Sequence, residues 1–291
     1  MINYVNKYNL PESVVRVLQH DEYDDHDAFA SVTSLIDSPY IWKMRKLYLK
    51  DPDIKIDIEV ANLFNPMFGT AVHALLDKAC SHVPGMEVEK RLFTEIVGKT
   101  VSGKADLYQD GIITDYKVTS KYAVRYNKYK PEWEDQLNSL AYLFEKNGYE
   151  VKGLQIVAIL KDLLPQDKFS NEFPPIHIKT ITIPKWSLQE QGLYLEKRVR
   201  LFDAYDKNDV TSHCSPTERW QTATQYAVKK RESKTAFRLL NDIESARALA
   251  QEKGMIVELR PGTDKRCEGY CELTGVCSYA IERGYNIQQE H

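Results

Sequence analysis

Apolar residues between positions 65 and 80 repeat at the period of an α-helix. The repeating positions are Phe68, Val72, Leu75, Leu76 and Ala79. Asn65 is a favourable N-cap and Pro66 suits the first helical position, so we expect the helix to begin here. His73 falls beside the apolar stripe, which places an imidazole at the edge of the packed face.

The chain then changes to the spacing of extended strands. The expected strands are 86–97, 100–108 and 111–119. The tripeptide "QDG" at 109–111 predicts a tight hairpin between the second and third strands. Proline at 131 and glycine at 148 frame a helix over 131–147.

Two more strands are expected at 154–163 and 176–183, and the first of them is nearly all apolar, as in a central strand. The order helix–strand–strand–strand–helix–strand over 65–163 therefore predicts a compact α/β core. Ser187 and Glu190 form a capping box for a helix that reaches about residue 206.

The remaining segments predict helices. Residues 31–50 indicate a helix with a broken start near Pro39, and helical segments are expected at 215–231 and 242–253, before a short strand "MIVELR". We therefore expect three parts, an N-terminal helical segment (1–64), a core (65–206) and a mainly helical C-terminal lobe (207–291).

Composition narrows the class of protein only a little. With 43% hydrophobic and 28% charged residues, the chain has the make-up of a soluble globular protein. No apolar run is long enough for a membrane helix, and the first residues lack the features of a signal peptide, so we expect a cytoplasmic protein. The net charge of −3 gives no overall case for nucleic acid, but two local stretches are basic, 120–130 and 228–238.

Two carboxylates and a lysine gather on the predicted hairpin. Asp106 and Asp115 lie on adjacent strands, and Lys117 shares a face of its strand with Asp115. Converging carboxylates repel one another unless a cation compensates, and Mg²⁺ prefers such oxygen ligands. Ordinary surface ion pairs on a hairpin are the alternative interpretation.

The flanking motifs resemble a known family. "GKADLYQDGIITDYK" is similar to the G-x-x-D…(D/E)-x-K signature of the PD-(D/E)XK nuclease superfamily, and "FGTAVHALLD" resembles the G-x-x-x-H helix of its RecB-type exonuclease branch. The resemblance implies a restriction-endonuclease-like αβββαβ core. It also implies that Asp106, Asp115, His73 and the carbonyl of Tyr116 bind Mg²⁺ or Mn²⁺, with Lys117 as the catalytic lysine.

Two further positions follow from the same resemblance. Glu89 matches an acidic residue on the first core strand or is an ordinary surface glutamate. Gln136 fits the glutamine of the helix after the DxK strand, where it would contact substrate. The branch usually has a tyrosine four residues later, but this chain has Leu140, and Tyr142 lies on another helical face.

Three cysteines crowd the C-terminal region. Cys267, Cys271 and Cys277 predict a metal site rather than disulfides, with Cys214 or Cys80 as the fourth ligand. Spacing alone does not separate Zn²⁺ from an iron–sulfur cluster. RecB-type, CRISPR-adaptation and phage nucleases carry a four-cysteine [4Fe–4S] staple, and the resemblance to their phage-encoded subgroup favours Cys214.

These expectations converge on one function. The chain is expected to be a divalent-metal-dependent deoxyribonuclease, an exonuclease acting on DNA in phage or prophage recombination, repair or replication. A phage single-strand-annealing or replication protein is an expected partner. The alternative is a non-catalytic DNA-binding recombination scaffold on the same fold.

Overall fold

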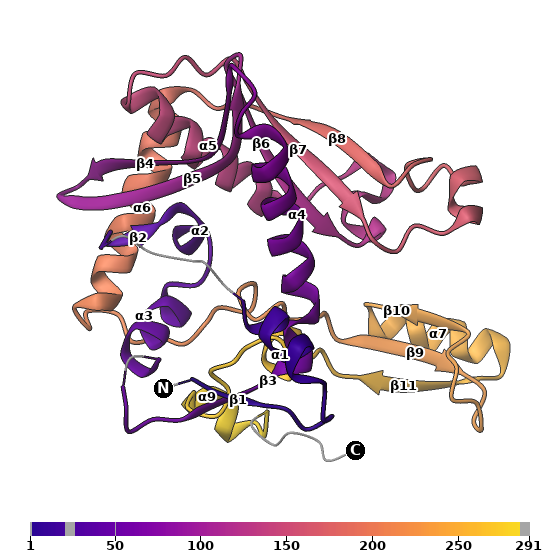
Figure 1. The fold of residues 1–291 in the computed structure, drawn as a ribbon. Coiled ribbons are helices and arrows are strands. Elements are labelled where there is room, and N and C mark those ends of the chain that lie inside the picture. Colours follow the sequence, from indigo (N-terminus) through magenta and orange to yellow (C-terminus); the bar gives the residue numbers. More distant parts are fainter. Residues whose placement is uncertain (1, 21–26, 50, 286–291) are drawn as a thin grey trace.

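A mixed six-stranded sheet forms the centre of the fold (Figure 1). The computed structural model describes residues 2–20, 27–49 and 51–285. In the sheet, β4 and β6 run antiparallel to β5, β2 runs parallel to β5, β7 runs parallel to β6, and β8 runs antiparallel to β7. The strands are β2 (Ala30–Ser31), β4 (Met86–Ile96), β5 (Lys99–Gln109), β6 (Ile112–Thr119), β7 (Gly153–Leu160) and β8 (Ile178–Ile183). The expected mixed α/β class is confirmed.

Strand β5 is shared between two neighbours on one of its edges. It pairs with β6 only from Leu107 to Gln109, and with β2 at Val101 and Ser102. The two-residue turn Asp110–Gly111 has φ values of 51° and 85°, the left-handed pair that a tight hairpin requires. On the side of Leu107 away from this turn, β5 and β6 no longer pair, so the sheet opens there.

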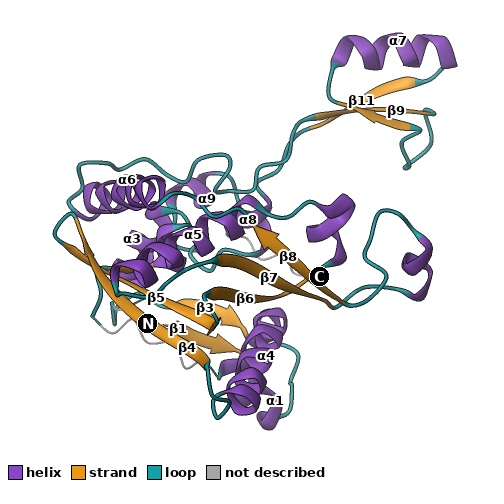
Figure 2. Cartoon of the chain, turned by 90° about the horizontal axis from the view of Figure 1, so that it is seen from above, coloured by secondary structure: helices purple, strands orange, loops and turns teal. Residues whose placement is uncertain are grey.

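One face of the sheet is covered by long helices. Figure 2 shows α5 and α6 on the side of the sheet opposite α4. The helices on this face are α2 (Val32–Leu35), α3 (Pro39–Tyr48), α5 (Pro131–Lys146) and α6 (Leu188–Asp206), and the expected capping box of Ser187 and Glu190 is present. Leu140 and Leu143 of α5 are fully buried and lie over Gly103 of β5. The main hydrophobic core therefore lies directly beneath the strand that carries Asp106.

The helix α4 (Phe64–Cys80) lies on the other face and has no fully buried residue. The 3₁₀ helix η1 (Val60–Leu63) runs directly into it, so Leu63 is the N-cap and the predicted N-cap at Asn65 is wrong. Asn65 lies one residue inside the helix, where its side chain accepts a hydrogen bond from Lys161. The predicted order over 65–163 is observed, since α4, β4, β5, β6, α5 and β7 follow one another.

The two ends of the chain differ from the helical segments expected of them. β1 (Ile2–Val5) pairs with β3 (Ile56–Glu59), α1 (Glu12–Gln19) lies between them in sequence, and β2 joins the central sheet. The predicted helix at 215–231 is wrong, because 225–229 is a strand. Tyr226 and Val228 alternate there to pack on a helix. The elements after 207 are β9 (Gln225–Lys229), β10 (Arg238–Leu240), α7 (Ile243–Lys253), β11 (Ile256–Arg260), α8 (Lys265–Gly269) and α9 (Ser278–Glu282).

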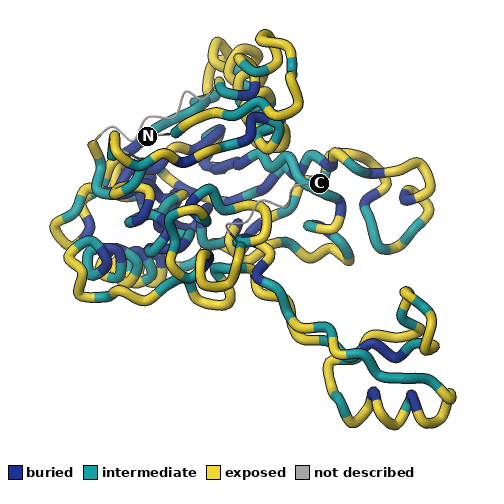
Figure 3. Tube along the Cα trace, turned by 90° about the horizontal axis from the view of Figure 1, so that it is seen from below, coloured by how far each residue is buried: buried dark blue, intermediate teal, exposed yellow. Residues whose placement is uncertain are grey.

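The three strands β9, β10 and β11 and the helix α7 form a small unit that projects from the body (Figures 1 and 2). Figure 3 shows buried segments concentrated in the body, whereas this unit is mostly intermediate or exposed. None of the helices in the described part of the chain has both the length and the apolar character that a membrane crossing needs.

The packing at Gly103 gives a stability prediction. A Cβ at Gly103 would lie 2.8 Å from Leu140 and from Leu143 and 3.1 Å from Val32, so Gly103→Ala should lower the free energy of unfolding by about 1–3 kcal/mol. Gly69→Ala in α4 meets no atom within 4 Å and should raise it by roughly 0.5–1 kcal/mol. Urea unfolding of both variants measures this, and equal effects would contradict the packing account.

Candidate active site

A side chain of β5 bonds to the backbone of β6 across the opening between the two strands. The backbone N–H of Tyr116 donates a 2.7 Å hydrogen bond to Oδ2 of Asp106. This carboxylate thus satisfies a β6 donor that faces no β5 carbonyl. Asp106 is only 7% exposed, so the arrangement fixes a buried carboxylate at the fork of the two strands.

Asp115, Lys117 and Gln136 form a closed triangle beside it. Nζ of Lys117 lies 3.0 Å from Oδ1 and 2.8 Å from Oδ2 of Asp115, and it donates to Oε1 of Gln136 at 2.9 Å. Nε2 of Gln136 donates to Oδ1 of Asp115 at 3.0 Å. Because α5 supplies Gln136, the main helix of the core fixes the orientation of both functional groups on β6.

His73 of α4 approaches Asp106 from the other side. Its Nδ1 lies 3.1 Å from Oε1 of Glu89 and 3.5 Å from Oδ1 of Asp106. The pairing of β4 with β5 omits one pair, Glu89 with Asp106, and Glu89 has a φ of 51°. A left-handed backbone at a non-glycine residue is strained, and here it accompanies a glutamate that bonds to His73 instead of lying in a regular ladder.

The buried charges of this group shift one another's protonation. Burial, followed by repulsion from Asp115, raises the pKa of Asp106 to about 7. The hydrogen bond with Glu89 raises the pKa of His73. Burial raises the pKa of Glu89, but hydrogen bonds from His73 and Lys104 outweigh it and leave that pKa below its ordinary value.

The donor set fits a divalent cation. Ligand atoms of His73, Glu89 and Asp106 all lie within 4.8 Å of one another. Oδ2 of Asp115 is buried and accepts no well-directed hydrogen bond, although Lys117 is within ion-pair distance. Two buried carboxylates that repel each other, one of them with an unsatisfied oxygen, are what a Mg²⁺ or Mn²⁺ ion would stabilise.

The structure brings His73, Asp106, Asp115, Lys117 and Gln136 together. Of Tyr116, whose carbonyl was the expected ligand, the contact described here is the hydrogen bond that its N–H donates to Asp106. Lys104, which the sequence reasoning did not single out, forms an ion pair with Glu89. Lys104 lies two residues before Asp106 on the same strand, so both share one face, and this spacing could have identified Lys104 from the sequence.

The departure from the family pattern has a packing explanation. Leu140 lies one turn after Gln136 on the same face of α5, but it is fully buried over Gly103. Tyr142 turns away, and its ring lies 3.1 Å from the Cβ position of Gly192 in α6. Gln136 therefore reaches Asp115 and Lys117, whereas Leu140 packs in the core and Tyr142 packs against α6.

A second site lies at the C-terminal end of the chain. A small pocket there is lined by Cys214, Cys267, Cys271 and Cys277, and Cys80 is not among its lining residues. All four thiols are free. Burial, with the nearby Asp264 and the other thiols, raises the pKa of Cys267 to about 11. Burial also raises the pKa of Cys271, to about 12.

Charged residues that the sequence reasoning missed connect this pocket to the body. Arg266 donates to both carboxylate oxygens of Asp37 at 2.6 and 2.7 Å, which joins α8 to the turn between α2 and α3. Arg219 pairs with the buried Asp264 at 3.1 Å, and the hydroxyl of Tyr279 donates to Asp264 at 2.7 Å. The isolated charges gave no periodic signal in the sequence.

The basic stretch 120–130 is less available for an anionic ligand than its composition suggests. Lys121 is buried and paired with Asp167 at 2.7 Å, and Arg125 is paired with Glu172 at 2.6 Å. Tyr122 remains exposed. Within the described part of the chain, the cations of this stretch without an ion pair are Lys128 and Lys130 at its end.

Comparison with known proteins gives only distant similarities. No family model and no curated protein matches the chain. The structure of a protein named SSO0001 aligns with a TM-score of 0.42 and 17% identity over 65% of this chain and 85% of its own. An alkaline exonuclease from Laribacter hongkongensis aligns with a TM-score of 0.38 and 12% identity over 61% of this chain and 89% of its own. Its complex with dAMP aligns with a TM-score of 0.35 and 14% identity over 67% of this chain and 88% of its own. All of these TM-scores are below 0.5, so the function is inferred from the geometry of the site.

The raised pKa of Asp106 predicts a pH-dependent stability. Since the folded pKa of about 7 exceeds the unfolded value near 3.9, the native state retains a proton that the unfolded state has released, and stability falls from about pH 4 to pH 7. In the presence of a chelator, Asp106→Asn should raise the free energy of unfolding at pH 8 by on the order of 2 kcal/mol, because it removes a buried charge. At pH 4 the gain should disappear.

Denaturant unfolding at the two pH values tests this. Asp110→Asn, at the exposed hairpin turn, is the matched control and should change neither value. A loss of stability in Asp106→Asn that is equal at both pH values would contradict the electrostatic account.

Proposed function

We propose that this protein is a divalent-metal-dependent DNA nuclease that hydrolyses phosphodiester bonds. The observation that carries the proposal is the convergence of Asp106, Asp115 and Lys117 at the fork of β5 and β6. There the Tyr116 N–H fixes one carboxylate while Gln136 fixes the other and the lysine. An ordinary hairpin with surface ion pairs would leave its carboxylates exposed, whereas Asp106 and Asp115 are 7% and 3% exposed.

Each residue of the group has a task that its contacts suggest. Asp106, Asp115 and His73 would hold the metal, with Glu89 as a further candidate ligand from β4. A bound Mg²⁺ or Mn²⁺ supplies Lewis-acid polarisation of the phosphate and a more acidic water. The ammonium of Lys117, held by Asp115 and Gln136, orients the attacking water and offsets negative charge that develops on the phosphate.

The strained Glu89 positions the imidazole of His73. Its carboxylate accepts from Nδ1 of His73 and pairs with Lys104, so the ring is held beside Asp106. Such a carboxylate–histidine contact is the usual way that proteins fix a ligating ring.

The narrower parts of the proposal rest on the sequence resemblance. They are exonuclease action, a cytoplasmic role in phage or prophage recombination, repair or replication, and cooperation with a single-strand-annealing or replication protein. Residues 65–206 would form the catalytic part of the chain, with 1–64 and 207–291 attached to it.

For the cysteine pocket we propose a structural [4Fe–4S] cluster held by Cys214, Cys267, Cys271 and Cys277. Four sulfurs around one zinc ion lie roughly 3.8 Å apart, since each Zn–S bond is about 2.3 Å. Among the described residues no three of these sulfurs lie within 4.8 Å of one another. A cluster binds each thiolate to a different iron, so it suits the wider spacing better.

Variants of the hairpin test the nuclease proposal. Asp115→Asn and Lys117→Met should each lower the rate of cleavage of linear DNA roughly 10³-fold, because the first weakens the metal site and the second removes the ammonium that acts on the phosphate. In the presence of a chelator, DNA affinity should rise for Asp115→Asn, which loses a negative charge, and fall slightly for Lys117→Met, which loses a positive one. Asp110→Asn, at the turn of the same hairpin, is the control and should cleave at the wild-type rate.

Gel assays with end-labelled DNA give the rates, and anisotropy gives the affinities. Unchanged cleavage by Asp115→Asn would contradict the assignment of the site.

Iron analysis of anaerobically purified protein tests the cluster proposal. The wild type should contain about four iron atoms per chain and absorb visible light. Cys271→Ser should lose most of this iron, whereas Cys80→Ser should retain it because Cys80 does not line the pocket. A colourless wild type with one zinc ion per chain would refute the proposal.

A further inference from the structure

The unit formed by β9, β10, α7 and β11 is an arm that leaves the body through a narrow neck. Gln221 pairs with Asp264, and Thr222 N–H donates to the carbonyl of Thr263 at 2.9 Å. A Cβ at Gly262 would lie 2.0 Å from the carbonyl oxygen of Thr222, so the two strands of the neck are in close contact. The arm comprises residues 222–263, between Cys214 and Cys267 in the chain.

The two faces of the arm's sheet differ sharply. One face packs on α7 through a small apolar cluster of Tyr226, Val228, Leu240, Ala246, Leu249 and Val257. The alternate positions of the strands form the other face. Phe237 and Leu239 on that face are 59% and 43% exposed, so it presents an aromatic ring and an aliphatic side chain to solvent.

Cations lie on the same face of the sheet and in the adjoining turn. On the open face Lys229 and Arg260 both pair with a single carboxylate, that of Glu258. The adjoining turn adds Lys230, Arg231 and Lys234, and these three have no ion pair within the part of the chain that the structure describes. Overall the arm has eight lysines and arginines against five acidic residues, although the whole chain has a net charge of −3.

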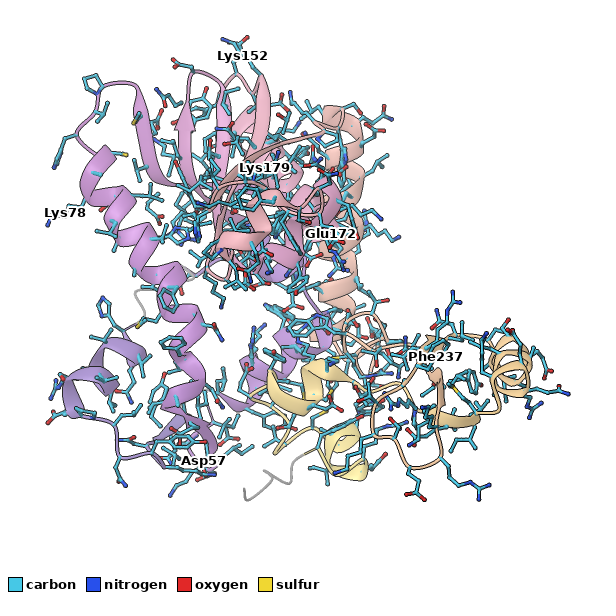
Figure 4. The ribbon with its side chains drawn as sticks, turned by 90° about the vertical axis from the view of Figure 1, so that its right-hand side faces the viewer. Asp57, Lys78, Lys152, Glu172, Lys179 and Phe237 are labelled. Carbon is cyan, nitrogen blue, oxygen red and sulfur yellow. The ribbon has the colours of Figure 1, made fainter. Side chains whose placement is uncertain are left out.

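The open face is directed toward the body of the protein. Figure 2 shows α7 on the outer side of the arm, with the sheet between α7 and the body. In Figure 4 the labelled Phe237 lies on the side of the arm that faces α4, opposite α7. The ring therefore lies on the side of the arm nearer to α4, the helix that supplies His73.

We propose that this open face of the arm binds single-stranded DNA, a role that rests on the proposed nuclease function. An exposed aromatic ring on a sheet suits an unstacked base, because stacking is worth a substantial free energy for every base type. The cations of this face and of the adjoining turn suit the phosphates of such a strand. A protein partner fits less well, since charged residues are depleted at the centres of protein interfaces.

DNA binding by the full-length protein in the presence of a chelator, which prevents cleavage, tests the inference. Fluorescence anisotropy would compare a labelled oligothymidine strand with a blunt duplex of equal length. Phe237→Ala should weaken binding of the single strand roughly 5- to 100-fold and should weaken binding of the duplex much less. Replacing Lys230, Arg231 and Lys234 with alanine should lower the slope of log affinity against log salt by about 2.

Arg247→Ala is the matched control, because it removes an exposed cation from α7 on the covered side of the sheet. Its affinity for both probes should stay within about twofold of the wild type. Unchanged single-strand binding by Phe237→Ala, an equal loss for the duplex, or an equal loss in Arg247→Ala would each overturn the proposal.

The two proposals can fail separately. A wild type that binds single strands through Phe237 but cleaves no DNA with Mg²⁺ or Mn²⁺ would refute the nuclease function alone. Metal-dependent cleavage by a protein whose Phe237→Ala variant binds like the wild type would refute only the role of the arm.

Discussion

The hydrogen bond from the Tyr116 N–H to Asp106 is the constraint on which the site depends. It allows β5 and β6 to separate without leaving a buried donor unsatisfied, and it fixes the carboxylate where the strands part. A regular ladder would have satisfied the same N–H with a carbonyl, and Asp106 would then have lost its anchor. The contact accompanies the opening in the sheet and the burial of the carboxylate. It lowers the pKa of Asp106, but burial and repulsion from Asp115 outweigh it and leave that pKa raised.

The rest of the fold holds that opening in a fixed shape. Gly103 lets Leu140 and Leu143 of α5 pack closely on β5, and the same helix places Gln136 against Asp115. In contrast, α4 has no fully buried residue and holds His73 through polar contacts, mainly with Glu89. The side of the site built on α5 is therefore rigid, and the side built on α4 is the easier one to displace.

Much of the site was predictable because its signals are local. The Asp–Gly turn fixes the hairpin, and the hairpin brings Asp106 and Asp115 together. The orientation of Glu89 was not predictable, because it depends on a left-handed backbone that no neighbouring residue requires. The strand at 225–229 was predicted as helix because its pairing with β10 and with the more distant β11 leaves no signal within the segment itself.

Digestion of DNA by the wild-type protein tests the central claim most directly. End-labelled linear duplex, linear single strands and closed circles would be incubated with Mg²⁺, with Mn²⁺ and with chelator. The account predicts that linear DNA is degraded only when metal is present, from its ends, while closed circles survive. Linear DNA that stays intact with either metal, or is degraded equally in chelator, would contradict it.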